Sequence, residues 1–285
     1  MLYIVNGVDK MNFRIGNDGS VRIVTVFEEF KEIKDFPELC TFVTENDLFK
    51  AQVGDIYSNV SFSGENIILV GLGKEAELTM EAFRIAFYNL GKALMKLKVK
   101  SINIAVEVFQ NCDFKQTIQA MTEGLLQSEY RFEKYLTKKK IVPTVEDVAF
   151  NVLEENENDA LSAIAQAELL LDGVFLARDL VNEPAIYMTP KRLAMAAKNE
   201  LSPLGVTVDI LGRDEVSELN MDAFLAVSKG STQEPQFIVM TWNGNPDSEY
   251  KTAFVGKGLT YDSGGYSIKP SSGMVEMKSD RRAHV

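Results

Sequence analysis

The feature that most constrains the fold is a regular alternation of short apolar runs with longer amphipathic stretches. In the first half of the chain, two apolar runs, Val21–Phe27 and Asn66–Val70, have the length of buried strands. Apolar residues recur at helical spacing over Leu78–Leu97 and Phe114–Leu126, and a further apolar run covers Ser101–Val108. Because strands that alternate with helices favour a parallel or mixed sheet, the sequence predicts an α/β fold.

A change of composition near the middle of the chain predicts two domains. The stretch Pro143–Asp159 is polar and acidic, and an apolar helix is expected after it, over Ala160–Val181. We therefore predict an N-terminal α/β domain over residues 1–150, and a bridging helix with the first part of a second α/β domain over residues 151–285. A chain of 285 residues is long enough for two domains of ordinary size.

The second half of the chain continues the alternation of helices and strands. Thr189 and Pro190 are suited to the cap and the first turn of a helix. After this helix we expect three strands, over Val206–Leu211, Phe237–Trp242 and Thr252–Val255. We also expect one short helix, over Asp214–Leu219.

Composition disfavours several kinds of site and partner. With one histidine, His284, and two cysteines, Cys40 and Cys112, the chain is poorly suited to a Ser-His-Asp triad, a His-rich zinc site or a disulfide framework. A formal net charge of -11 disfavours phosphate backbones and anionic lipid. The N-terminus lacks the features of a signal peptide, and no stretch approaches the roughly 20 apolar residues of a membrane span. We expect a cytoplasmic protein without membrane or nucleic-acid partners, in which carboxylates hold any metal.

Two glycine-containing segments are candidates for binding phosphate. Gly71–Gly73 follows a predicted strand, but the dinucleotide-binding pattern needs a third glycine and a helix start that are missing here. We therefore favour a tight turn. The second segment, Gly256–Gly258, departs from the Walker pattern because Lys257 is followed by glycine rather than by serine or threonine.

The residues after Phe254 carry the strongest chemical signal in the chain. A predicted strand leads into a glycine-rich loop, and glycine permits the close backbone approach that a crowded site at a strand end requires. Two lysines and two aspartates occur in this region: Lys257, Asp262, Lys269 and Asp280. From the residue types alone, this is a polar site at the end of a strand. A glycine-rich bulge with surface charges is the alternative.

The segment Gly256–Gly265, followed by Ser267-Ile268-Lys269, closely resembles the metal-site segment of the leucyl (cytosol) aminopeptidases. The resemblance extends over most of the chain, through Ala177–Ala185 with Met188–Pro190, Phe224–Ser231, and the weaker matches Val70–Gly73 and Tyr130–Tyr135.

The resemblance implies an enzyme that releases N-terminal, leucine-like residues from peptides with two divalent metal ions, manganese or zinc. By position, Lys257, Asp262 and Asp280 match metal ligands, and Lys269 matches the catalytic lysine. Carboxylates suit such cations, and Lys257 can be a ligand only as a neutral amine, which burial beside two cations would favour. Lys269 as a cation would stabilise a developing oxyanion. Family members form hexamers, so the resemblance also implies a homo-oligomer.

The sequence departs from the family pattern after Asp280. In the family, the rest of the catalytic domain supplies a further aspartate and glutamate ligand and an arginine that holds a bicarbonate base, whereas residues 281–285 here are Arg-Arg-Ala-His-Val. We expect a C-terminally truncated member with an incomplete metallopeptidase domain and negligible activity by itself. A non-catalytic remnant with an interaction or regulatory role is the alternative. His284 is disfavoured as a replacement ligand.

Overall fold

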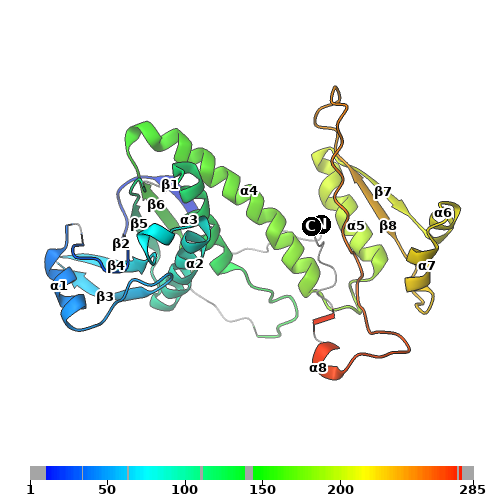
Figure 1. The fold of residues 1–285 in the computed structure, drawn as a ribbon, viewed down its shortest axis with the longest axis horizontal. Helices are drawn as coiled ribbons and strands as arrows, with labels where there is room; N and C mark the ends of the chain where they lie inside the picture. Colours follow the sequence, from blue (N-terminus) through cyan, green and yellow to red (C-terminus); the bar gives the residue numbers. More distant parts are fainter. Residues whose placement is uncertain are drawn as a thin grey trace. The chain divides into compact units, whose positions relative to one another are not determined.

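A computed structural model describes residues 11–33, 35–62, 64–109, 112–138, 144–274 and 276–277. Contacts divide the chain into two compact units, one extending to Phe175 and one beginning at Leu176 (Figure 1). The division falls within α4 (Glu157–Asn182), the helix that we expected to bridge two domains. The domain boundary near residue 150 stays a prediction.

The described residues of the N-terminal unit form a six-stranded sheet in the order β1-β6-β5-β2-β4-β3. Neighbouring strands are parallel except for β3 and β4, which are antiparallel. The strands are β1 (Asn12–Ile15), β2 (Val21–Val26), β3 (Ile56–Phe62), β4 (Glu65–Gly71), β5 (Ser101–Ala105) and β6 (Asp147–Asn151). The helices are α1 (Pro37–Glu45), α2 (Met80–Leu97) and α3 (Phe114–Glu129), with short 3-10 turns η1 (Glu75–Glu77) and η2 (Glu154–Asn156). The predicted α/β class is confirmed.

Both faces of this sheet are buried. Successive side chains of a strand point to opposite faces, so neighbouring residues of one strand can belong to two different cores. In β4, Ile68 and Val70 belong to a core shared with α2, α3 and the start of α4. Ile67 and Leu69 belong to a second core, shared with α1. A parallel strand buried on both faces has a continuous apolar sequence, which is the pattern that Asn66–Val70 shows.

Helices α2 and α3 lie close together because each has a glycine at the contact. A Cβ atom at Gly124 of α3 would lie 2.5 Å from the carbonyl oxygen of Arg84 and 3.0 Å from Cβ of Phe87, both on α2. A Cβ atom at Gly91 of α2 would collide with the hydroxyl of Ser128 on α3. Any side chain at these positions would push the two helices apart.

The glycines at the end of β4 do not form the tight turn that the sequence favours: the chain over Gly71–Gly73 continues beside other segments, with the backbone N–H groups of Leu72 and Gly73 donating to the carbonyl oxygens of Val26 and Ala51. Gly73 has a φ of 76°, in the left-handed region that suits glycine. Helix α2 begins only at Met80, where the hydroxyl of Thr79 accepts a hydrogen bond from the backbone N–H of Ala82. The glycines therefore do not form the helix start that a phosphate loop needs.

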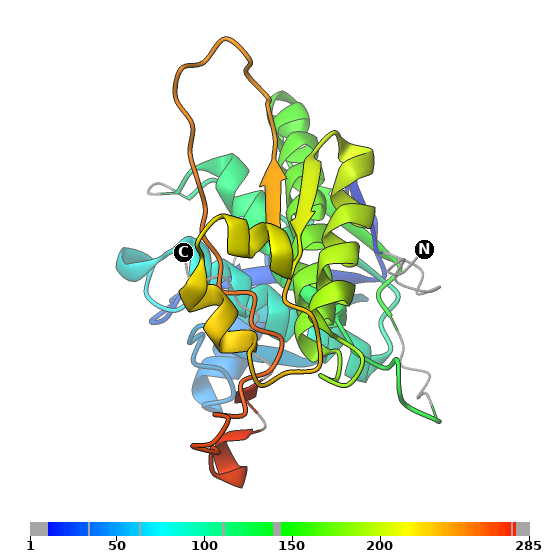
Figure 2. The ribbon, with the colours of Figure 1, turned by 90° about the vertical axis from the view of Figure 1, so that its right-hand side faces the viewer.

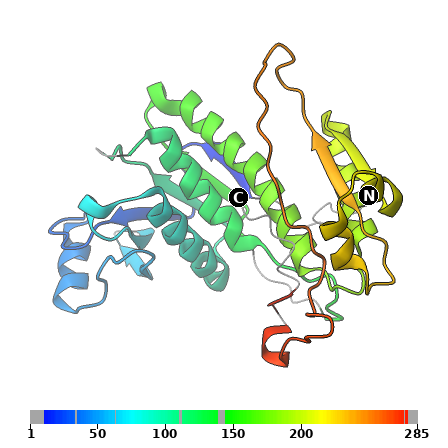
Figure 3. The same cartoon turned by 45° about the vertical axis from the view of Figure 1, so that its right-hand side comes forward.

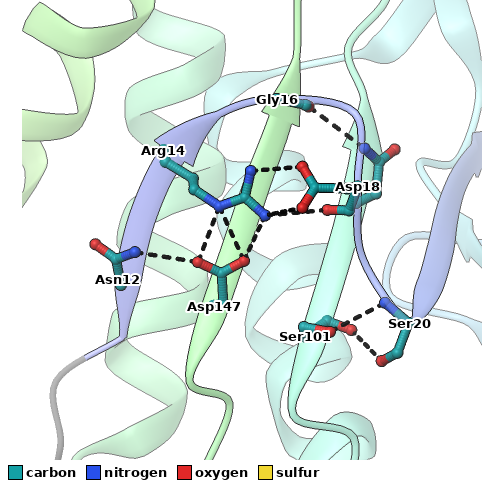
Figure 4. A network of polar contacts seen from close by, with 8 residues as sticks. Asn12, Arg14, Gly16, Asp18, Ser20, Ser101 and Asp147 are labelled. Carbon is teal, nitrogen blue, oxygen red and sulfur yellow. Dashed lines mark hydrogen bonds and ion pairs between the residues drawn. The ribbon is translucent and has the colours of Figure 1, made fainter.

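A polar network joins β1 to β6 (Figure 4). The guanidinium of Arg14 donates to the carboxylate of Asp147 at 2.7 Å and to that of Asp18 at 2.7 Å. Asn12 donates a further hydrogen bond to Asp147, at 3.0 Å. These bonds to Arg14 lower the pKa of both carboxyl groups, so the network is ionised at neutral pH. It fixes the outer strand of the sheet through charge-assisted hydrogen bonds.

Helix α4 is long and apolar. Its N-terminal part packs into the core through Ala160, Ala163 and Ile164, whereas Leu169 is 76% exposed. Contrary to the sequence-based expectation, the 29-residue stretch Glu154–Asn182 is long and apolar enough to cross a membrane by length and composition. Core helices of soluble proteins can have the same length and composition.

The C-terminal unit contains an antiparallel strand pair, β7 (Thr207–Leu211) and β8 (Phe237–Thr241), with α5 (Pro190–Leu201) in contact with β7 (Figure 2). Thr189 accepts a hydrogen bond from the backbone N–H of Arg192, which confirms the predicted start of α5. The remaining described elements are η3 (Ser202–Leu204), α6 (Arg213–Glu218), α7 (Asp222–Ser228) and α8 (Ser271–Met274).

The strand predicted over Thr252–Val255 is wrong. The described chain from residue 242 to residue 259 contains no strand, and this stretch leaves β8, turns back and leads on towards α8 (Figure 3). Phe254 and Val255 are 80% and 86% exposed. A strand needs a neighbour for its backbone groups, and within the described residues β7 and β8 pair only with each other.

Candidate active site

The glycine-rich segment Gly256–Lys269 contains a closed turn. The backbone N–H of Lys269 donates to the carbonyl oxygen of Ser263 at 3.0 Å. Between them, Gly264 and Gly265 have φ angles of 87° and 61°, which side-chain-bearing residues rarely adopt. A Cβ atom at Gly264 would also lie 3.2 Å from Cγ of Lys269. The glycines therefore allow the two ends of the turn to meet.

Asp262 and Lys269 form an ion pair across this turn. The Nζ atom of Lys269 lies 2.7 Å from Oδ2 of Asp262, and Oδ1 of Asp262 accepts a hydrogen bond from the backbone N–H of Gly264 at 3.0 Å. Both side chains keep about a third of their surface exposed, 31% for Lys269 and 32% for Asp262. The bond to Lys269, followed by that to Gly264, lowers the pKa of Asp262, so this carboxyl is ionised at neutral pH.

Lys257 belongs to the same electrostatic environment. Its positive charge contributes to the lowered pKa of Asp262. The structure therefore brings together three residues that the sequence analysis selected: Lys257, Asp262 and Lys269. The fourth, Asp280, lies outside the described residues, as does His284.

Two methionines contact the site, and the sequence analysis gave neither of them a role. Sδ of Met277 lies 2.8 Å from Nζ of Lys269. The hydroxyl of Tyr261 donates to Sδ of Met274, the last residue of α8, at 3.3 Å. Thioether sulfur is a weak hydrogen-bond acceptor, so these contacts position the lysine and the loop with little charge compensation. Nothing in the sequence spacing distinguishes these methionines from packing residues.

The described residues do not by themselves fit a two-metal centre. Across the described ranges, no group of three or more histidine, cysteine, aspartate or glutamate side chains is arranged to hold an ion. The Asp262 carboxylate is engaged by Lys269, and two divalent cations require several oxygen or nitrogen ligands. The geometry of these residues therefore supports a polar, mixed-charge site.

A depression in the N-terminal unit offers no comparable chemistry. It is lined by residues that include Arg22, Asp35 and Asn151. The guanidinium of Arg22 is already paired with Asp35 at 2.7 Å, so its charge is compensated within the protein. The segment around Asp262 is therefore the better candidate for a functional site.

Two family models match the chain. The catalytic-domain model of the cytosol aminopeptidase family matches residues 175–282, and the N-terminal-domain model of the same family matches residues 38–139. The chain belongs to the cytosol aminopeptidase family. The resemblance seen in Gly256–Lys269 is thereby confirmed, and these residues lie within the range of the catalytic-domain model.

Curated members of the cytosol aminopeptidase family are similar over nearly the whole chain. A probable cytosol aminopeptidase of Clostridium tetani is 51% identical over 270 residues, which cover 95% of this chain and 56% of the relative. One of Treponema denticola is 38% identical over 271 residues, with the same two coverages of 95% and 56%. The chain thus spans little more than half the length of these relatives.

Solved structures share the fold. A tomato leucine aminopeptidase variant matches with a TM-score of 0.72 at 26% identity, over 92% of this chain and 57% of that protein. The bottromycin maturation enzyme BotP, in a complex with Mn, matches with a TM-score of 0.71 at 23% identity, over 92% of this chain and 53% of that protein. At its lower identity, the BotP match shows the fold alone.

Proposed function

We propose that this chain carries the N-terminal domain and part of the catalytic domain of a divalent-metal aminopeptidase that releases N-terminal, leucine-like residues from peptides. The observation that carries this proposal is the Asp262–Lys269 pair, held in a glycine turn inside the segment that the catalytic-domain model matches. Family membership and the fold support it.

The proposed roles follow the family pattern by position. Asp262, Asp280 and Lys257 are metal ligands, and Lys269 is the cation that stabilises negative charge on the carbonyl oxygen of the scissile bond. When bound, two divalent ions would polarise that carbonyl and lower the pKa of a water molecule. Because the described residues include no group of three or more histidine, cysteine, aspartate or glutamate side chains that could hold a metal ion, we expect the 285-residue chain to have negligible activity by itself.

The proposal extends to cofactor, partners and location. We propose manganese or zinc as the metal, supported by the Mn complex of the structural relative BotP. We propose peptides with a free N-terminus as substrates and a hexamer as the assembly. We also propose the cytoplasm as the location, which the names of the curated cytosol aminopeptidases support. The net charge of -11 argues against nucleic acid as a partner.

A chimera tests the catalytic proposal. Residues 1–277 of this chain are joined to the remaining C-terminal part of the Clostridium tetani relative, which is 51% identical where the two align. We expect Mn²⁺-dependent hydrolysis of a leucine chromogenic amide that falls by about a hundredfold or more in Asp262→Asn and in Lys269→Ala. Lys251→Ala, a change of an exposed lysine, is the matched control. A folded chimera without turnover would contradict the proposal.

The alternative function is that of a non-catalytic remnant with an interaction or regulatory role. It is supported by the lack, among the described residues, of any group of three or more histidine, cysteine, aspartate or glutamate side chains that could hold a metal ion. The test is hydrolysis of the same amide by the 285-residue chain in excess Mn²⁺, next to its Lys269→Ala variant. Turnover that disappears in the variant would exclude the alternative, whereas turnover that persists would indicate a contaminating peptidase.

A further inference from the structure

The depression in the N-terminal unit lies where three parallel strands end. Its lining includes Thr25 of β2, Val106 directly after β5, and Asn151, the last residue of β6. Because β2, β5 and β6 are parallel, these residues lie at the same carboxyl edge of the sheet. The depression is therefore built on strand ends, which hold side chains more firmly than a loop does.

The topology makes this edge a preferred place for a ligand. From β2 the chain leads to α1, which shares a core with Ile67 and Leu69 of β4. From β5 it leads to α3, which shares a core with Ile68 and Val70 on the opposite face. Neighbouring strands whose connections leave to opposite faces form a topological switch point. Open α/β sheets bind ligands outside the carboxyl ends of the strands at such points.

The lining carries one charge that the protein does not compensate. The guanidinium of Arg22 is paired with Asp35 at 2.7 Å and lies over the ring of Phe36, 5.1 Å from its centroid. By contrast, the exposed carboxylate of Glu107 has neither a hydrogen bond nor an ion pair within the described ranges. The depression therefore attracts a cation, and the formal net charge of -11 acts in the same direction.

Two further acceptors line the depression beside Glu107. They are the hydroxyl of Thr25 and the side-chain carbonyl of Asn151, and neither side chain has a hydrogen bond to another described residue. A primary ammonium group has three N–H donors, which matches these three acceptors in number. Hydrogen bonds from an ammonium to a carboxylate are also stronger than those between neutral groups.

The rest of the lining is apolar and suits a short hydrocarbon chain. It consists of Val24, Ala105, Val106, Val152 and Leu153. Leu153 is 62% exposed, so a ligand that covers it removes apolar surface from water. The depression has a volume of about 240 Å³, less than the roughly 300–1,000 Å³ of pockets that hold drug-sized ligands. It therefore suits a small molecule.

We infer that this depression binds a small primary ammonium ion with a short aliphatic chain. Glu107, Asn151 and Thr25 accept hydrogen bonds from the ammonium group, and the aliphatic chain packs on the apolar lining. The role of this site is binding, not reaction. The inference is separate from the proposed function, because every lining residue belongs to the N-terminal unit and none to the segment around Asp262.

The experiment is a titration of the purified 285-residue chain with isopentylammonium, followed by saturation-transfer nuclear magnetic resonance of the ligand. A dissociation constant on the order of 1–10 mM is expected for a ligand of this size. Isopentanol has the same chain without the charge and should bind about two- to fivefold more weakly. Isovalerate, the matching anion, should bind more weakly still, because Glu107 repels it.

Variants place the ligand in the depression. Glu107→Gln should weaken binding of isopentylammonium about two- to fivefold, because the exposed ion pair is lost. Glu75→Gln is the matched control, since Glu75 is an exposed glutamate that follows β4 at the same edge of the sheet and does not line the depression. Ala105→Leu puts a larger side chain into the depression and should remove detectable binding. Circular dichroism establishes that each variant is folded.

Four results would overturn the inference. They are the absence of binding at ten times the expected dissociation constant, equal affinity for isopentylammonium and isovalerate, equal affinity of Glu107→Gln and Glu75→Gln, and unchanged binding by folded Ala105→Leu. Asp262→Asn should bind isopentylammonium as tightly as the unaltered chain; a loss there would place the ligand in the candidate active site and also contradict the inference. Hydrolysis by the chimera does not depend on Glu107, so failure of this inference and failure of the proposed function are distinguishable.

Discussion

Glu129, the last residue of α3, carries a prediction about the pH dependence of stability. Its Oε1 atom is buried without a hydrogen-bond partner. Burial raises the pKa of this carboxyl from 4.5 to about 7, although the backbone N–H of Val145 and the charges of Arg131 and Lys92 act in the opposite direction. An anion at the C-terminal end of a helix is also unfavourable with respect to the helix dipole.

The magnitude follows from linkage between proton binding and folding. Since the folded state holds the Glu129 proton more tightly than the unfolded state, the contribution of Glu129 to stability is greatest below pH 4.5 and declines as the pH rises to about 7. A shift of this size corresponds to about 3 kcal/mol at most. Because part of Glu129 still reaches solvent, we reduce the expected effect to about 1–2 kcal/mol. Glu129→Gln, which cannot ionise, should therefore be more stable than the unaltered chain by about this amount above pH 7.

The assay is urea unfolding followed by far-ultraviolet circular dichroism at several pH values across this window. Glu38→Gln, a change of an exposed glutamate on α1, is the matched control and should keep the pH slope of the unaltered chain. Equal slopes for Glu129→Gln and the unaltered chain would refute the reasoning. That result would mean that Glu129 is hydrated, or paired, in the folded state.

Two further predictions concern packing and exposure. Gly124→Ala should destabilise the N-terminal unit by about 1–3 kcal/mol, because the methyl group would meet the carbonyl of Arg84. Gly173→Ala on α4 is the control and should be neutral or stabilising, because a Cβ atom there meets nothing within 4 Å. Equal effects of the two substitutions in urea unfolding would show that α2 and α3 can separate freely. Trp242, the one tryptophan of the chain, is 73% exposed. Its fluorescence should therefore resemble that of indole in water and be quenched readily by acrylamide. A blue-shifted signal that acrylamide does not quench would mean that another surface covers this side chain.

The sequence predicted the elements whose apolar residues are numerous and regular. Helix α2 is one example, because Phe83, Phe87 and Leu90 repeat at helical spacing and are all fully buried. Strand β6 was missed, although Val148 to Phe150 are also fully buried. Three apolar residues inside an acidic stretch are too few to reveal a strand, and their place between β1 and β5 depends on long-range pairing. The strand predicted over Thr252–Val255 is wrong because its apolar residues, although they suit a strand, have no described strand beside them to pair with.

The same limits apply to the candidate site. The motif identified Asp262 and Lys269, because residue types and spacing within Gly256–Lys269 are specific. Their direct ion pair was not predicted, since it depends on the left-handed backbone at Gly264 and Gly265, which bends the turn back on itself. The contact from Met277 to Lys269 was also not predictable, because it joins residues on either side of α8 through the path of the chain.

Cleavage of a leucine-initiated peptide by the chimera, followed by mass spectrometry with Mn²⁺ present, tests the central claim most directly. The claim is that Asp262 and Lys269 belong to a site that removes residues from a free N-terminus. We predict loss of the N-terminal leucine from the free peptide, no cleavage of the same peptide with an acetylated N-terminus, and no cleavage of either by Asp262→Asn. Cleavage at internal bonds, equal cleavage of the acetylated peptide, or unchanged cleavage by Asp262→Asn would contradict the account.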